Sequence, residues 1–241
     1  MFKYRLDISY DGKEFSGSQI QPHRRTVEGE LITHLSKLCT FGDLTFSGRT
    51  DVGVHARQQV VSFESTIDNE DKVRKSLSRM LPRDIRVKNI KKVYGGFDAR
   101  YSAKSRTYVY FIKNIAKSIP TDRHTTLLIE DTLDLTKLNR ASQLFVGKND
   151  YKNFSKEGSQ RNTVKMITQA NWKEFNGLYR FTISGNSFLW QMVRSIVGSL
   201  LALNDNKLKE IDIMDYLNRK ELRRIPYISA PDGLFLWKVK Y

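Results

Sequence analysis

The stretch FSGRTDVGVHA, residues Phe46–Ala56, joins two runs of strand-forming residues, Asp43–Ser47 and Gln58–Phe63. A turn with two glycines between strands lets backbone and side chains approach a ligand closely. Arg49 stands two positions before Asp51, the only carboxylate of the stretch, so this spacing predicts a permanent cation beside that carboxylate. Such a cation keeps Asp51 ionised and oriented, as a nucleophile requires. A tight hairpin with an ordinary surface ion pair explains the same residues, and the stretch alone leaves both interpretations open.

The residues around this loop alternate between strand and helix patterns. Phe2–Tyr10 alternates apolar and polar residues, which is typical of a strand with one buried face. Thr26 fits the N-cap of a helix that ends near Phe41, and Pro82 stops a second helix. A further strand is predicted over Ile85–Tyr94. Together with the two strands beside the loop, this gives a β-α-β-β-α-β order, the split-βαβ or ferredoxin-like arrangement.

The remainder of the chain repeats this order. Its expected elements are the strand Arg106–Lys113, the helix Leu135–Phe145 closed by Gly147, the strands Val164–Trp172 and Tyr179–Ile183, the helices Ser187–Leu203 and Ile211–Leu217, and the strand Leu234–Tyr241. No linker rich in Gly, Ser or Pro separates the two parts. We therefore predict an α+β fold of two ferredoxin-like halves, residues 1–103 and 104–241. They are expected to join in one mostly antiparallel sheet with helices on one side and an active-site cleft between the halves.

The chain carries a large excess of positive charge. Its 41 Lys and Arg residues against 26 Asp and Glu residues give a net charge of +15, which indicates a nucleic acid or an acidic membrane as partner. The longest apolar stretch, Phe188–Leu203, is interrupted by Gln191 and Arg194 and is too short to span a bilayer, which favours nucleic acid. A single basic cluster is usually a solvated face, but four clusters favour phosphate contacts: Lys72/Arg74/Lys75/Arg79, Lys88/Lys91/Lys92, Lys152/Lys156/Arg161/Lys165 and Arg219/Lys220/Arg223/Arg224.

The chain contains one cysteine and no motif for a metal or a nucleotide cofactor. Cys39 alone excludes a disulfide framework and a cysteine metal site, and it fits a reducing cytoplasm. His55 has no His, Cys or carboxylate at metal-ligand spacing, so its chemistry favours a structural role that holds the loop. No signal peptide is expected at Met1, because that residue leads directly into a strand pattern.

Five motifs together resemble the TruA family of tRNA pseudouridine synthases. The most specific is Gly48–Ala56, and the others are weak alone but occur in the family's order: Tyr10–Gln19, Phe97–Arg100 with Lys104–Tyr110, Met192–Gly198 and Pro231–Leu234. The resemblance covers essentially the whole chain. Ser18 stands where bacterial members usually carry tryptophan, which predicts an altered packing or RNA contact at that position.

The resemblance implies isomerisation of uridine to pseudouridine in the anticodon stem-loop of tRNA, at positions 38 to 40. By resemblance Asp51 is the nucleophile, attacking either the sugar C1′ or the base C6. Arg49 and Arg194 would orient and stabilise it, and Tyr108 would stack on the base and serve removal of the C5 proton. The implied substrate contacts are Tyr108, Leu234, Arg100, Arg106, Gly48, Thr50 and His55. The resemblance further implies a homodimer, in which the C-terminal half completes the active site and forms the dimer interface. A cytoplasmic location, and the absence of a membrane partner, a metal or another cofactor, are expected from the lone cysteine, the short apolar stretch and the lack of cofactor motifs.

Two of these residues can also be interpreted without the family. Arg194 lies on an otherwise apolar helix, where an arginine is costly unless it meets an anion such as Asp51 or extends to solvent. Tyr108 shares a strand face with Arg106 and Tyr110, where ordinary half-buried packing is the alternative to stacking on an extruded base. Only Tyr108 of these two tyrosines matches the family's active-site tyrosine.

Two other classes of protein remain open at this point. Ferredoxin-like sheets often bind RNA through aromatic faces without catalysis, so a non-catalytic RNA-binding module is one alternative. A hydrolase with paired carboxylates is the other, but it needs a second carboxylate across the site, and the sequence does not nominate one.

Overall fold

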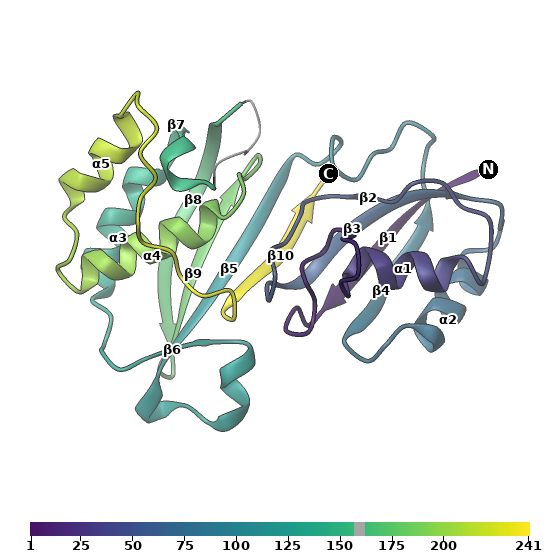
Figure 1. The fold of residues 1–241 in the computed structure, drawn as a ribbon, viewed down its shortest axis with the longest axis horizontal. Helices are drawn as coiled ribbons and strands as arrows, with labels where there is room; N and C mark the ends of the chain where they lie inside the picture. The colour runs from purple at the N-terminus through teal and green to yellow at the C-terminus, as the bar shows by residue number, and fades with distance from the viewer. Residues whose placement is uncertain (157–161) are drawn as a thin grey trace. The chain divides into compact units, whose positions relative to one another are not determined.

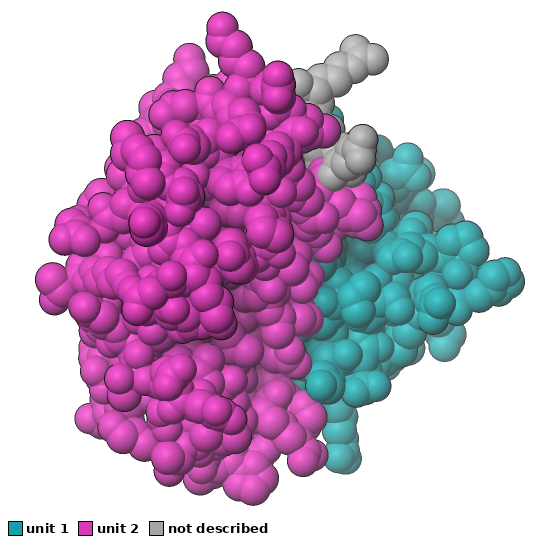
Figure 2. All heavy atoms as spheres, turned by 60° about the vertical axis from the view of Figure 1, so that its left-hand side comes forward, with its two compact units in different colours: residues 1–104, 235–241 teal, residues 105–234 magenta. Residues whose placement is uncertain are grey.

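A computed structural model describes residues 1–156 and 162–241, and it divides the chain into two compact units. Unit 1 comprises Met1–Lys104 and Phe235–Tyr241, and unit 2 comprises Ser105–Leu234 (Figure 2). Each unit combines helices with a mostly antiparallel sheet (Figure 1), which confirms the predicted α+β class. In the described parts of the chain, no helix has the length and apolar character needed to cross a membrane.

Unit 1 follows the predicted β-α-β-β-α-β order. Its elements are β1 (Phe2–Tyr10), α1 (Val27–Leu35), β2 (Thr45–Phe46), β3 (His55–Ser65), α2 (Glu70–Met80) and β4 (Ile85–Lys92), with the last strand β10 (Leu234–Lys240). The strands lie in the order β4-β1-β3-β10, with β2 paired to β3. Thr26 caps α1 as predicted, because its side chain accepts the N–H of Gly29, and Asn69 caps α2 in the same way.

The last strand belongs to unit 1, whereas the sequence analysis places it with the second half. The physical reason is a long-range pairing: Phe235 and Leu236 lie parallel to His55 and Ala56 of β3. The Tyr241 hydroxyl then donates to the carbonyl of Ala99 at 2.8 Å, which holds the chain end in the same unit. The alternating pattern of a strand identifies the strand but not the partner that it joins.

Unit 2 is built on the antiparallel order β5-β9-β8-β7, with β6 parallel to β5. Its strands are β5 (Ser105–Asn114), β6 (Leu127–Ile129), β7 (Gly147–Asp150), β8 (Val164–Phe175) and β9 (Leu178–Gly185). Its α-helices are α3 (Leu135–Ser142), α4 (Met192–Asn204) and α5 (Glu210–Asn218). The described 3₁₀ turns are Ile115–Lys117, Pro120–His124, Gln143–Phe145 and Lys152–Phe154. The short strands β6 and β7 and these turns were not predicted.

Two helices of unit 2 are shorter than the sequence predicts. The helix expected over Leu135–Phe145 ends at Ser142 and continues as a 3₁₀ turn, before Gly147 takes a left-handed φ of +108°. The helix expected from Ser187 begins only at Met192, because Gln191 adopts a left-handed conformation with φ of +63°. Phe188 and Leu189 therefore lie in an irregular segment rather than in a helix, where Leu189 is buried and Phe188 is half-buried.

Candidate active site

The loop of residues 48–54 lies between β2 and β3, and the segment after β1 holds its first part. The N–H of Ser18 donates to the Thr50 carbonyl at 3.1 Å, and the Thr50 N–H donates back to Ser18 Oγ at 2.9 Å. Gly17, with φ of +94°, packs so closely that a Cβ there would lie 2.9 Å from the Thr50 carbonyl oxygen. Ser18 is therefore buried against the loop.

The segment after Asp51 turns back tightly. The N–H of Val54 donates to the Asp51 carbonyl at 3.1 Å, and Gly53 supplies the left-handed φ of +78° that this turn needs. Asp51 itself is half-buried. Its backbone is thus held on both sides, by Ser18 before it and by the turn after it.

Arg49 does not form the ion pair with Asp51 that its spacing in the sequence predicts. Its side chain is exposed, and the salt bridges found among the described residues do not include an Arg49–Asp51 pair. The reason is the conformation of the loop: the Thr50 side chain turns inward and is buried, while the residue before it faces solvent. Backbone hydrogen bonds, rather than this neighbouring cation, hold the Asp51 turn.

His55 fastens the end of the loop to the segment that follows β1. Its ring is 1 % exposed and stacks on Phe235 with ring centroids 4.6 Å apart. Its Nδ1 accepts the N–H of Gly12 at 3.0 Å and lies 3.1 Å from a carboxylate oxygen of Asp11. This geometry supports the holding role that the chemistry of the sequence suggests.

We expect Gly12→Ala to destabilise unit 1 by about 3 kcal/mol, because a Cβ at Gly12 would overlap the carbonyl group of Val54 and push the loop outward. Thermal unfolding checks the stability, and a uridine-modification assay should lose activity together with it. Gly95→Ala is the matched control, since a Cβ there meets nothing within 4 Å and should change stability by less than about 0.5 kcal/mol. Equal unfolding midpoints for the two variants would contradict the predicted packing.

Unit 2 places three predicted side chains on β5, at alternating positions of one face. Tyr108 lies opposite Ile183 and is 8 % exposed, with its ring edge-on to Phe188 at 5.0 Å. Arg106 is equally buried, and its guanidinium donates to the carbonyl of Asn186 at 2.7 Å. Tyr110 has no exposed surface, whereas Arg106 and Tyr108 each keep a small exposed fraction.

The hydroxyl of Tyr110 forms a hydrogen bond within unit 2. It donates to the Ala230 carbonyl at 2.6 Å, and burial raises the pKa of Tyr110 far above its usual value. A neutral, buried phenol with a backbone partner fits packing better than chemistry. The two tyrosines of this strand therefore differ in environment.

Arg194 is the third residue of α4, and hydrogen bonds with Ser229 of unit 2 hold it in place. Its Nε donates to the Ser229 carbonyl at 2.8 Å, and the Ser229 N–H and hydroxyl donate back to the Arg194 carbonyl at 3.0 and 3.1 Å. The cost of an arginine on an apolar helix is thus met partly by a backbone acceptor. Leu234 is the last residue of the Pro231–Leu234 turn, which its N–H closes by donating to the Pro231 carbonyl at 2.8 Å, and its side chain is almost completely buried.

The structure therefore assembles the predicted site residues in two groups. In unit 1 one loop carries Gly48, Arg49, Thr50 and Asp51, and His55 follows it as the first residue of β3. Arg100 lies outside this loop, with its guanidinium over the Tyr101 ring at 5.5 Å. In unit 2 the strand β5 carries Arg106 and Tyr108. Arg194 of α4 bonds the Ser229 carbonyl, and Leu234 closes the turn that begins at Pro231. Within the ranges that the structure describes, no three His, Cys, Asp or Glu side chains gather as a metal site.

Comparisons with known proteins cover the full length of the chain. The sequence profile described as tRNA pseudouridine synthase matches residues 141–241. Proteins named tRNA pseudouridine synthase A are 37 % identical over 247 residues in Dictyoglomus turgidum, 38 % over 246 in Dictyoglomus thermophilum and 34 % over 245 in Borrelia duttonii, each over 100 % of both chains. A solved archaeal box H/ACA sRNP Nop10–Cbf5 complex overlaps with a TM-score of 0.34 and 10 % identity, over 83 % of this chain and 43 % of that chain, which is too weak to support an argument.

Proposed function

The chain belongs to the tRNA pseudouridine synthase A (TruA) family, and on that premise we propose that it isomerises uridine to pseudouridine in the anticodon stem-loop of tRNA, at positions 38, 39 or 40. The observation that carries this proposal is the loop around Asp51. It presents a half-buried carboxylate on a backbone that hydrogen bonds hold before and after it. A nucleophile needs such a fixed position near its target.

The proposed reaction conserves atoms and electrons. The C1′–N1 glycosidic bond breaks, the uracil turns, and a C1′–C5 bond forms while C5 loses a proton and N1 gains one. Asp51 is the proposed nucleophile, at C1′ or at C6, and it leaves when the new bond is complete. The uridine must first leave the base stack, which costs a few kcal/mol that contacts in the site offset. This chemistry requires neither a metal nor a redox cofactor.

Residues of unit 2 are proposed to serve the same reaction. Tyr108 would stack on the uracil and serve removal of the C5 proton, and Leu234 would pack beside the base. Arg194 would stabilise the charge of Asp51, a role that its fixed guanidinium supports. Arg106 and Arg100 are proposed substrate contacts, together with Gly48, Thr50 and His55.

Arg49 is proposed to act on the RNA instead of orienting Asp51. Its exposed guanidinium lies two residues from the nucleophile and forms no ion pair with a carboxylate of the described residues. A cation in that state is available to a phosphate that approaches the loop.

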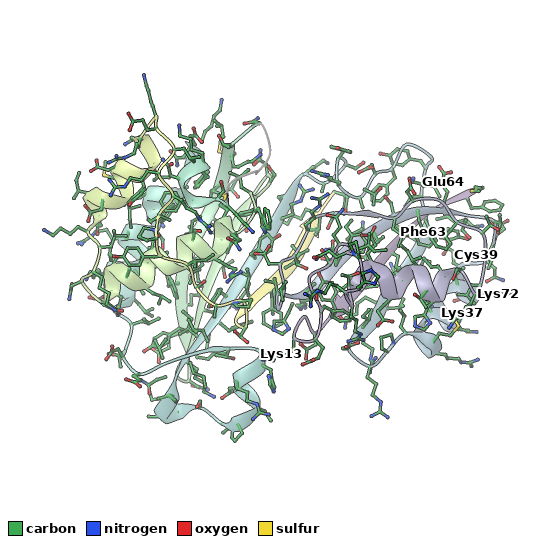
Figure 3. All side chains as sticks on the ribbon, viewed as in Figure 1. Lys13, Lys37, Cys39, Phe63, Glu64 and Lys72 are labelled. Atoms are coloured by element: carbon green, nitrogen blue, oxygen red, sulfur yellow. The ribbon has the colours of Figure 1, made fainter. Side chains whose placement is uncertain are left out.

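The surface of α2 supports a phosphate-binding role for unit 1. Lys72, Lys75 and Arg79 stand at i, i+3 and i+7, so they line one side of the helix, and all three are exposed (Lys72 is labelled in Figure 3). None of them has a carboxylate within 4.0 Å among the described residues. Of the other predicted clusters, Arg161 lies outside the described residues, and Lys165 is buried, which lowers the pKa of its amine.

A cytoplasmic homodimer is proposed on the family resemblance. The single cysteine supports the reducing compartment. Mass measurement of the purified protein in solution tests the dimer directly.

The proposed function predicts new pseudouridine at one or more of positions 38, 39 and 40 when an unmodified tRNA transcript is incubated with the protein. Chemical mapping of pseudouridine along the transcript checks it, and a transcript with cytidines at these positions is the control. Modification outside the anticodon arm would overturn the substrate assignment. Free uracil or a cut strand would indicate the hydrolase, and tight binding without modification would indicate the non-catalytic RNA-binding module.

A further inference from the structure

Five polar side chains of unit 1 are buried in the Asp51 loop or in the segments that its chain contacts. Each is at most 7 % exposed, and they come from β1, the segment after it, the start of the loop and β3: Tyr10, Ser18, Ser47, Thr50 and Gln59. Buried polar groups are costly unless their hydrogen bonds are made. Their gathering at this place therefore requires an explanation.

The hydrogen bonds of Gln59 fix the entrance to the loop. Its Oε1 accepts the Ser47 hydroxyl at 2.6 Å and the Val60 N–H at 3.1 Å, and its Nε2 donates to the Gly48 carbonyl at 2.8 Å. One fully buried amide thus holds two consecutive residues of the entering chain. An apolar side chain of similar size would fill the same space and make none of these bonds.

The hydroxyl of Tyr10 fixes the residue immediately before Asp51. It lies 2.8 Å from Thr50 Oγ1, and both groups are buried. Burial raises the pKa of Tyr10 to about 12, so the phenol stays protonated and able to donate. The β1–β3 pairing shifts between Ile8 and Tyr10, from Gln59 to Ala56, and such a bulge redirects a side chain beside a functional loop.

We propose that Gln59 and Tyr10 are positioning residues that hold Asp51 at its reacting distance through this buried network. The inference rests on the proposed function of Asp51 as nucleophile. Together with the Ser18–Thr50 bonds, the network ties Ser47, Gly48 and Thr50, so the chain cannot shift without breaking buried hydrogen bonds. A displacement of about 1 Å at a reacting group can cost about 10²-fold in rate, which gives such a network a catalytic value beyond stability.

Tyr10→Phe tests the proposal, because it removes one hydroxyl and leaves the ring. We expect the single-turnover rate of pseudouridine formation to fall about tenfold, with the dissociation constant for tRNA unchanged. In a Thr50→Val background, Tyr10→Phe should cause no further loss, since the shared bond is already absent. A rate within twofold of the wild type, a loss confined to tRNA affinity, or multiplying effects in the double variant would each overturn the proposal.

A matched control separates positioning from general stability. Ser142→Ala removes a buried hydrogen bond of the same kind in unit 2, where Trp172 Nε1 donates to Ser142 Oγ at 3.1 Å. It should lower the unfolding midpoint as Tyr10→Phe does but leave the single-turnover rate unchanged, and an equal loss of rate would overturn the proposal. If Asp51→Asn is inactive and Tyr10→Phe is fully active, the inference about the network is overturned and the nucleophile assignment stands. If Asp51→Asn is active, the nucleophile assignment and the network inference both fail.

Discussion

Asp51→Asn is expected to lower the single-turnover rate of pseudouridine formation by more than about 10⁴-fold, because the amide keeps the size of the side chain but has no nucleophilic oxygen. The fold of the loop should survive this change, since the bonds that hold it there use the backbone: Val54 N–H to the Asp51 carbonyl, and the reciprocal Ser18–Thr50 pair. The affinity for tRNA should consequently stay close to that of the wild type. Rapid-quench mapping of modified transcript and a filter-binding titration measure the two quantities.

Asp43→Asn provides the control for this prediction. It makes the same chemical change at an exposed carboxylate eight positions earlier in the chain, in the segment that leads into β2. Its rate should remain within about twofold of the wild type, as for an ordinary surface substitution. An Asp51→Asn protein that modifies tRNA within tenfold of the wild-type rate would show that Asp51 is not the nucleophile.

The elements of this fold could be predicted because their signals are local. Alternation alone gives β1 at Phe2–Tyr10, as observed, and a threonine followed by acidic residues gives the start of α1. Helix ends were less accurate: α1 ends at Leu35 instead of near Phe41, because the chain turns there with the N–H groups of Leu38 and Cys39 bonded to the Leu35 carbonyl. The pairing of β10 with β3 joins residues about 180 positions apart, and no local pattern encodes it.

In the candidate site, too, features encoded locally could be predicted and those that depend on the folded chain could not. The glycine-rich turn around Asp51 is evident from residue types, but the outward direction of Arg49 depends on the burial of Thr50, which spacing does not reveal. One acceptor for the Arg194 guanidinium is the backbone carbonyl of Ser229, which any residue type at that position could supply. Gln59 was missed because one of two adjacent glutamines at the start of an apolar strand resembles a surface position until its three hydrogen bonds are seen.

Tyr108→Phe decides whether the tyrosine of β5 acts through its ring or through its hydroxyl. The phenylalanine ring can still pack edge-on to Phe188 and stack on an extruded uracil, so the affinity for tRNA should not change. If the hydroxyl serves removal of the C5 proton, the single-turnover rate should fall by about 10²-fold or more, the usual contribution of a positioned acid or base. Tyr108→Ala should lose more, because it removes the stacking surface as well.

Tyr110→Phe is the matched control, two positions along the same face of the strand. It leaves the half-buried Ala230 carbonyl without the donor that the buried Tyr110 supplies, so the free energy of unfolding should fall by about 1–3 kcal/mol while the rate of modification stays unchanged. The opposite result, a full rate for Tyr108→Phe and a slow reaction for Tyr110→Phe, would transfer the proton role to Tyr110. Full rates for both variants would leave the ring of Tyr108 with stacking alone, and removal of the C5 proton would then have to fall to another base, with Asp51 the first to test.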